Sequence, residues 1–76
     1  MRELVEFLCT ELVDDPDAVS VTESFDDRGP VYRVQVSDGE LGKLIGRGGR
    51  TAKAIRTVVR AAAGRQHLAA RVDFED

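Results

Sequence analysis

The sequence predicts an α+β fold with three helices packed on one face of a three-stranded sheet. Apolar residues alternate with polar ones over three segments, which is the period of a half-buried strand, and recur at helical spacing over three others. A cluster of glycines joins the last two helical segments. The segments follow one another as helix, strand, strand, helix, helix, strand. With 76 residues, the chain has room for one domain, residues 1–76, and not for two.

Residues 2–13 are expected to form the first, amphipathic helix, which an acidic loop then ends. Its apolar face carries Leu4, Val5, Leu8, Cys9 and Leu12. The helix should stop at Asp14-Asp15-Pro16, because a residue that precedes proline disfavours the helical conformation. The aspartates Asp14, Asp15 and Asp17 raise the alternative of a metal site. No further ligand is spaced for an ion, so we expect a solvated loop instead.

Residues 18–26 and 32–36 are expected to pair as a hairpin, because polar and apolar residues alternate along both. The segment between them, Asp26-Asp27-Arg28-Gly29-Pro30, has the composition of a turn longer than two residues. Tyr32 is a candidate base-stacking platform, but valines lie in phase with it, so we place it in the core. The inward-facing residues are Val19, Val21, Phe25, Tyr32, Val34 and Val36.

A short helix that carries Leu41, Leu44 and Ile45 should precede the glycines, and a long helix should follow them. Ser37 and Glu40 have the spacing of a capping box that starts the short helix. Gly42 lies inside that helix at a cost of about 1 kcal/mol against alanine, which we attribute to close approach of another helix or of a bound strand. Gly64 is expected to end the long helix. Its core-facing residues are expected to be Ile55, Val58, Val59 and Ala62.

Residues 67–74 alternate again and are expected to form the third strand. His67 is expected at the surface rather than in a catalytic role, since no motif around it supplies a Ser or Cys partner. The inward residues are Leu68, Ala70, Val72 and Phe74, and the outward residues are His67, Ala69, Arg71 and Asp73.

The charge of the chain is strongly polarised although its net value is only −3. Residues 1–39 carry a net charge of −7, residues 40–66 carry +6, and residues 67–76 carry −2. The positive charge therefore gathers at the glycines and on the long helix, whose polar side carries Arg50, Lys53, Thr57 and Arg60. A solvated helix face is the ordinary explanation of such a row, but the absence of acids from residues 41–66 favours a nucleic-acid-binding face.

Composition also excludes several classes of site. The lone Cys9 cannot form an internal disulfide, and one cysteine with one histidine cannot build a four-ligand zinc site. A free thiol fits a reducing compartment, so we expect a cytoplasmic protein without a cofactor. No apolar run approaches the roughly 20 residues of a membrane span, and the acids Glu3, Glu6 and Glu11 argue against a signal or transit peptide.

The segment Ile45-Gly46-Arg47-Gly48-Gly49, with Ile55 in the helix after it, resembles the Ile-Gly-x-x-Gly signature of the KH domain. The wider string over residues 46–56 is similar to the small bacterial single-KH proteins of the KhpA/YlqC type, which have about this length. The predicted element order also matches the type II KH fold, α-β-β-α-α-β. One departure is Ala52, where many KH domains have a large aliphatic residue.

The resemblance implies a protein that holds the backbone of single-stranded RNA in its GxxG loop, with a role in post-transcriptional regulation or as an RNA chaperone. It also implies self-association and pairing with a larger KH protein of the Jag type. The main-chain N–H groups of Arg47, Gly48 and Gly49 are expected to face phosphates, and Ile45, with Leu44 and Val36, to line a groove for bases. The predicted RNA-binding residues are Lys43, Ile45, Gly46, Arg47, Gly48, Gly49, Arg50 and Lys53.

Other glycine-loop chemistries do not fit the spacing. A dinucleotide fingerprint requires a preceding strand and a glycine at the position of Thr51, and a Walker A loop requires Gly-Lys-Ser/Thr, which the chain lacks. No paired carboxylates, nucleophile–base motif or metal cluster suggests an enzyme. A protein–protein interaction module that dimerises remains the alternative to RNA binding, because a small domain gains stability by associating.

Overall fold

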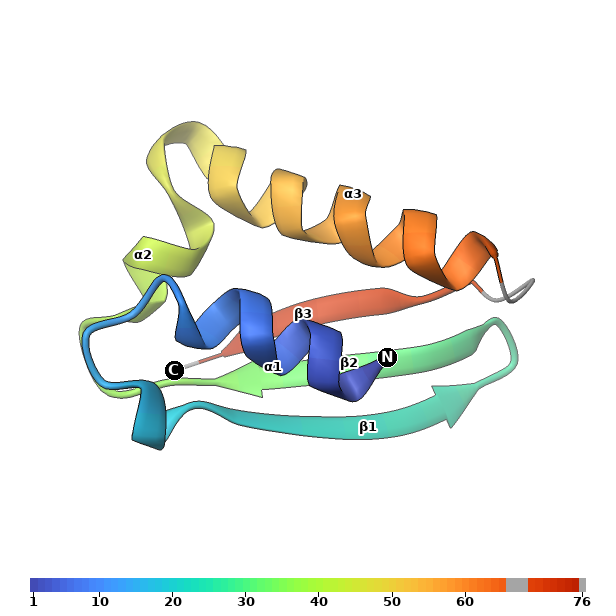
Figure 1. Ribbon diagram of the computed structural model, residues 1–76, viewed down its shortest axis with the longest axis horizontal. Helices are drawn as coiled ribbons and strands as arrows, with labels where there is room; N and C mark the ends of the chain where they lie inside the picture. The colour runs from blue at the N-terminus through green and yellow to red at the C-terminus, as the bar shows by residue number, and fades with distance from the viewer. Residues whose placement is uncertain (66–68, 76) are drawn as a thin grey trace.

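The structure, a computed structural model, describes residues 1–65 and 69–75 and has the predicted α+β architecture (Figure 1). Its sheet has the order β1-β2-β3, with β1 and β2 antiparallel and β2 and β3 parallel. The parallel pairing requires a crossover, which the second and third helices supply. The strands are β1 (Ser20–Asp26), β2 (Gly29–Gln35) and β3 (Arg71–Glu75).

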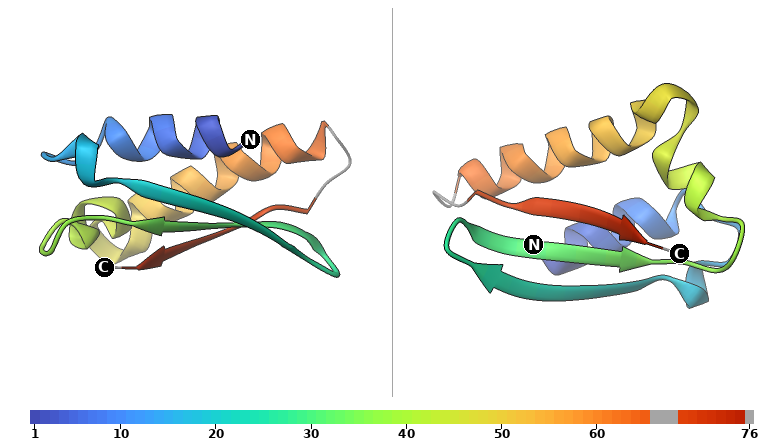
Figure 2. Two further views of the ribbon diagram at one scale, coloured as in Figure 1. Left: turned by 90° about the horizontal axis from the view of Figure 1, so that it is seen from below. Right: turned by 180° about the vertical axis from the view of Figure 1, so that it is seen from behind.

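The helices cover one face of this sheet and leave the other face open, as the two views of Figure 2 show. They are α1 (Arg2–Thr10), α2 (Leu41–Ile45) and α3 (Arg50–Gly64), with short 3-10 turns at Pro16–Ala18 and Arg47–Gly49. This layering confirms the predicted fold class and the order of its elements.

The core lies between the helices and the inner face of the sheet. Tyr32 is only 1% exposed, which confirms its predicted place in the core, and its hydroxyl donates a 2.7 Å hydrogen bond to Glu23. The open face of the sheet carries ion pairs instead, such as the 2.8 Å pair between Arg33 and Glu75. The largest fully buried side chains are Tyr32, Leu44, Val5, Val34, Val59, Pro30 and Cys9.

The first helix is shorter than predicted. It ends at Thr10 instead of residue 13, and Leu12, which was expected on the buried face, is 43% exposed. The chain leaves the helix axis because the main-chain N–H groups of Asp14 and Asp15 donate to Glu40, at 2.7 and 3.0 Å. That contact draws the acidic loop toward the start of α2.

Two further residues expected in the core lie at the surface. Val58 is 46% exposed, because the buried stripe of α3 runs at intervals of four residues through Ile55, Val59 and Ala63. Phe25 has the predicted phase in β1 but is 70% exposed. It sits at the end of the hairpin, which extends past the first turn of α1 (Figure 1).

The last strand begins at Arg71, later than the predicted start at residue 67. Ala70 and Val72 are buried and Phe74 is partly buried, so the predicted inward phase is correct for these residues. The predictions for His67 and Leu68 fall outside the described residues.

The predicted helix-end signals are wrong in two places. Ser37 and Glu40 do not form a capping box, since the Ser37 hydroxyl donates to the Asp15 carboxylate, at 3.1 Å, while Glu40 binds the acidic loop. Gly64 lies within α3, and Arg65 follows it with ordinary right-handed geometry. At Gly42, an added Cβ would meet no atom within 4 Å, so no neighbouring helix explains that glycine.

Candidate nucleic-acid interface

The glycine loop reverses the chain between α2 and α3 and stands at one end of the molecule (Figure 1). Its first glycine, Gly46, has φ 76° and ψ 173°, a conformation that is essentially restricted to glycine. A Cβ at Gly46 would overlap the hydroxyl of Thr51 and would lie 2.9 Å from the Thr51 main-chain nitrogen. The absence of a side chain therefore allows the start of α3 to fold back against the end of α2.

The next two glycines face open space. Gly48 and Gly49 have positive φ values of 63° and 78°, and a Cβ at either position would meet nothing within 4 Å. Both are therefore placed where another backbone can approach closely.

Two of the three main-chain N–H groups expected to face phosphate are available. The N–H of Gly49 donates to the Gly46 carbonyl at 3.1 Å, which corrects the prediction for that group. The N–H groups of Arg47 and Gly48 make no hydrogen bond within the described part of the chain. A pair of adjacent free donors at a helix start can bind an anion.

The side chains of Arg47, Arg50 and Lys53 extend into solvent around this loop. Within residues 1–65 and 69–75, none of the three forms an ion pair or hydrogen bond through its side chain. Ile45 and Gly46 are half-buried beside them. The loop thus combines open main-chain donors with three uncompensated positive charges.

Lys43 lies in a different electrostatic environment from the other predicted residues. Its ammonium group binds the Asp14 carboxylate and lies 3.1 Å from Glu40 Oε1. These bonds, first to Asp14 and then to Glu40, raise the pKa of Lys43. Hydrogen bonds from the N–H of Asp14 and, more weakly, from Lys43 lower the pKa of Glu40. We call Asp14, Glu40 and Lys43 the acidic clasp; it already compensates the charge of Lys43.

The predicted aliphatic groove for bases is wrong in two of its three members. Leu44 and Val36 are buried in the core between sheet and helices, because both point toward α3 and the sheet. Ile45 remains partly exposed beside the loop. The glycine loop therefore has little apolar surface next to it in the described structure.

Arg56, one of the basic residues close to the loop in sequence, has a structural partner. Its Nε donates to the Val72 carbonyl at 3.1 Å, and its guanidinium lies 5.1 Å from the centre of the Phe74 ring.

Sequence reasoning also missed the acidic clasp. Glu40 lies three residues before Lys43, a spacing that could have suggested their ion pair, but no local signal connects Asp14 to Lys43.

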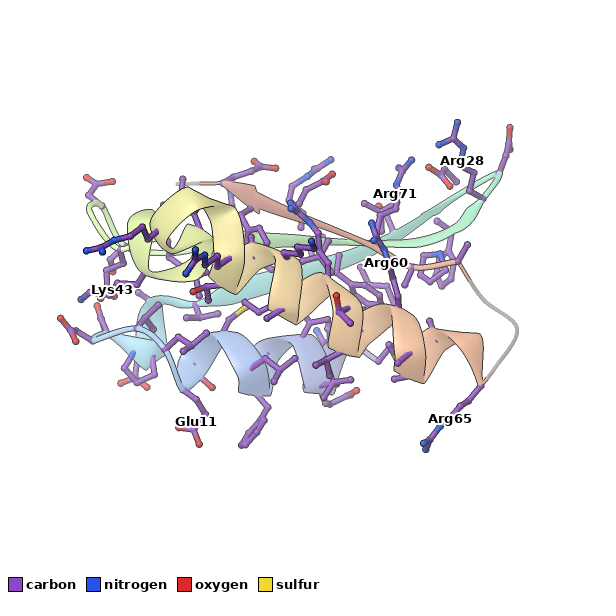
Figure 3. The ribbon with its side chains drawn as sticks, turned by 90° about the horizontal axis from the view of Figure 1, so that it is seen from above. Glu11, Arg28, Lys43, Arg60, Arg65 and Arg71 are labelled. Carbon is purple, nitrogen blue, oxygen red and sulfur yellow. The ribbon has the colours of Figure 1, made fainter. Side chains whose placement is uncertain are left out.

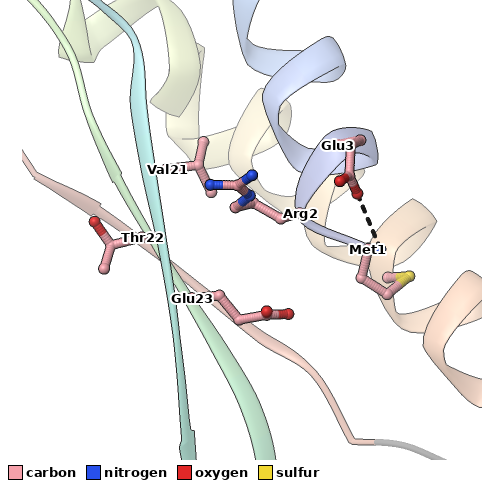
Figure 4. Close-up of a pocket in the computed structure, with 6 residues that line it drawn as sticks. All are labelled: Met1, Arg2, Glu3, Val21, Thr22 and Glu23. Atoms are coloured by element: carbon pink, nitrogen blue, oxygen red, sulfur yellow. Dashed lines mark ion pairs between the residues drawn. The ribbon is translucent and has the colours of Figure 1, made fainter.

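An open concavity lies away from the loop, beside the first turn of α1 and the middle of β1 (Figure 4). It is polar, and its lining residues are Met1, Arg2, Glu3, Val21, Thr22 and Glu23. It brings together none of the predicted site residues. Across the described chain, no group of three or more His, Cys, Asp or Glu residues is arranged to hold a metal ion, and no helix is long and apolar enough to cross a membrane.

Comparison with known proteins identifies a family match over nearly the whole chain. Residues 2–74 match the family described as KhpA/KhpB, KH domain. A protein of Halalkalibacterium halodurans named RNA-binding protein KhpA is 45% identical over 76 residues, the whole of both chains. Proteins of the same name from Streptomyces coelicolor and Clostridium perfringens also match. The first is 47% identical over 76 residues, all of this chain and 92% of the relative. The second is 49% identical over 63 residues, 83% of this chain and 84% of the relative. No solved structure matches at a significant level.

Proposed function

This chain belongs to the KhpA/KhpB KH-domain family, and from that premise we propose that it binds single-stranded RNA through its glycine loop. The family consists of RNA-binding proteins, not enzymes. Residues 1–76 would act as one KH unit that holds the sugar-phosphate backbone of about four unpaired nucleotides. We propose that the protein acts in the bacterial cytoplasm, where it would meet RNA of this kind.

The observation that carries the proposal is the glycine loop before α3, where main-chain donors and positive charges have no partners in the described chain. The N–H groups of Arg47 and Gly48 have no hydrogen-bond partner in the described chain, and Gly48 and Gly49 leave open space beside them. Arg47, Arg50 and Lys53 surround the loop without carboxylate partners in the described chain. A phosphate chain would satisfy both sets of groups at once, since charge-assisted hydrogen bonds to phosphate favour this arrangement.

The cations of the loop support an estimate of how strongly RNA would bind. Because the acidic clasp occupies Lys43, three cations at the loop remain without a partner among the described residues. Neutralising about three phosphates of a single strand gives a slope of about −2 for log K against log salt. With the aromatic Tyr32 buried, stacking contributes little. Binding by one copy should therefore be weak and tolerant of sequence, in keeping with a chaperone-like or post-transcriptional regulatory role.

The test is the double variant Arg47→Asp with Gly48→Asp, measured by fluorescence anisotropy with a single-stranded RNA probe. The two carboxylates replace a cation and occupy the open position where phosphate would lie, while Gly48 has room for the side chain. We expect a folded protein, verified by circular dichroism, that has lost RNA binding.

A matched control is Arg2→Asp with Gly39→Asp. It makes the same change in net charge, at an exposed arginine of α1 and at another glycine with positive φ, 85°, that has no neighbour within 4 Å of an added Cβ. This control should bind RNA as the unmodified protein does. Binding by the loop variant with an unchanged salt slope would show that RNA contacts another surface.

A second function, association with another protein, has one observation in its favour. On α3, Val58 is exposed beside Ala61 and Ala62, where the surface forms an apolar concavity. On α1, Phe7 is 58% exposed. We propose that the chain forms a homodimer, a heteromer with a Jag-type KH protein, or both. Sedimentation of Val58→Asp against the unmodified protein tests this, since loss of self-association is the expected result.

A further inference from the structure

The charge pattern of α3 extends well beyond the glycine loop. The helix has 15 residues and carries four cationic side chains and no acidic ones. Like charges three or four residues apart repel and destabilise a helix by about 0.2–0.5 kcal/mol per pair. Two arginines outside α3 are compensated, because Arg33 pairs with Glu75 and Arg71 pairs with Asp26. Among the described residues, no carboxylate pairs with a cation of α3.

Three of these cations lie in a line along one side of the helix. Lys53, Arg56 and Arg60 are spaced by three and four residues, so they fall on one face, and we call them the α3 basic row. Figure 3 shows Arg60 on the side of α3 opposite to Arg65. The row starts next to the glycine loop and leads away from it toward the far end of α3.

The middle member of the row is held in place by the sheet. Arg56 uses its Nε for the Val72 carbonyl and stacks over Phe74, while the terminal nitrogens of its guanidinium make no hydrogen bond within the described chain. A fixed guanidinium loses less side-chain entropy when it binds an anion than a free one does. Arg56 is therefore oriented between Lys53 and Arg60.

We propose that a bound RNA strand continues from the glycine loop along the α3 basic row, so that the protein contacts six or seven nucleotides instead of four. This inference rests on the function proposed above. Seven residues of helix separate Lys53 from Arg60, a rise of about 10 Å. At about 3.4 Å per nucleotide for a stacked strand, that distance corresponds to two or three further nucleotides.

RNA fits the row better than an acidic protein segment does. The row continues the cations of the loop without an intervening carboxylate, and its spacing follows a regular line of charges, as a phosphate backbone presents. If an acidic peptide occupied the row instead, the affinity for RNA would not depend on the cations of the row. The dependence of RNA affinity on RNA length therefore distinguishes RNA from an acidic peptide as the occupant of the row.

The experiment compares Arg60→Gln with Arg65→Gln, using fluorescein-labelled oligouridines of four and eight nucleotides. Both variants remove one positive charge from the end of α3, but from opposite sides of it (Figure 3). Glutamine is a good helix former, so both should fold, which urea denaturation verifies. The longer probe can bind at several positions along its length. The number of these positions is the same for both variants, so it does not affect the comparison of their affinities.

We expect Arg60→Gln to weaken binding of the eight-nucleotide probe about three- to fivefold and to reduce its salt slope by about 0.7. Binding of the four-nucleotide probe should not change, and Arg65→Gln should affect neither probe. Equal affinities of the two variants for the longer probe overturn the extended path while leaving the loop function intact. A loss on the shorter probe also overturns it. If the unmodified protein binds neither probe, the proposed function itself fails.

Discussion

Replacing Gly46 by alanine should destabilise the protein far more than replacing Gly48, although both glycines have positive φ and belong to one loop. Gly48 has an ordinary left-handed conformation and open space around it, so alanine there should cost about 1 kcal/mol. At Gly46, the backbone conformation itself costs about 1–3 kcal/mol for a residue with a Cβ.

Steric overlap adds to that difference. The new methyl group would lie 2.8 Å from the Cβ of Thr51 and 2.9 Å from its main-chain nitrogen, and a main-chain atom at the start of α3 cannot move aside alone. Overpacking of this kind typically costs about 1–3 kcal/mol. We therefore expect Gly46→Ala to lower the free energy of unfolding by about 3 kcal/mol or more. That is a large share of the total of about 4–11 kcal/mol expected for a chain of 76 residues.

Urea denaturation followed by circular dichroism measures both variants against the unmodified protein. Thermal midpoints should fall by about 12 °C or more for Gly46→Ala and by about 5 °C for Gly48→Ala. The added variant Thr51→Ala should restore little stability to Gly46→Ala, because the close main-chain nitrogen remains. Equal losses for the two glycine variants, or full rescue by Thr51→Ala, would refute the argument that the Thr51 backbone sets the shape of the loop.

Three further outcomes follow from the contacts around the site. Asp14→Asn removes the carboxylate that binds Lys43 and should free part of the positive charge of Lys43. RNA should then bind more tightly, and the salt slope of binding should steepen by up to about 0.7. An unchanged affinity and slope would mean that Lys43 lies outside the RNA path. The pKa of Glu40 is lowered in the folded state, so this carboxylate stabilises the fold above its unfolded pKa of about 4.3, and the contribution is lost as pH falls through the folded value. Glu40→Gln should therefore be less stable at neutral pH and should lose less stability than the unmodified protein between about pH 5 and pH 3, as urea midpoints at both pH values will show. Arg56→Met should lower the free energy of unfolding by about 1 kcal/mol, because it removes the hydrogen bond to Val72 and the contact with Phe74; an unchanged thermal midpoint would contradict this.

The contacts of the acidic clasp could not be predicted from the sequence. Asp14 lies in an exposed loop, as predicted, but its carboxylate binds Lys43, which is 29 residues away in the chain and was expected to contact RNA. Ser37 and Glu40 have the spacing of a capping box, yet both serve the same acidic loop. A local rule describes what a spacing permits, whereas a partner from a distant segment decides which contact forms.

The sequence by itself determined the number, type and order of the helices and strands and the presence of an open basic loop. These features are encoded locally, in the periods of two and 3.6 residues and in glycines that alone tolerate positive φ. Only the tertiary structure decided that β3 lies parallel to β2, that Ala63 instead of Val58 enters the core, and that Leu44 points away from the loop. It also decided that Lys43 is compensated while Arg47, Arg50 and Lys53 have no carboxylate partner among the residues that the structure describes, because those outcomes depend on which distant surfaces come together when the helices pack on the sheet.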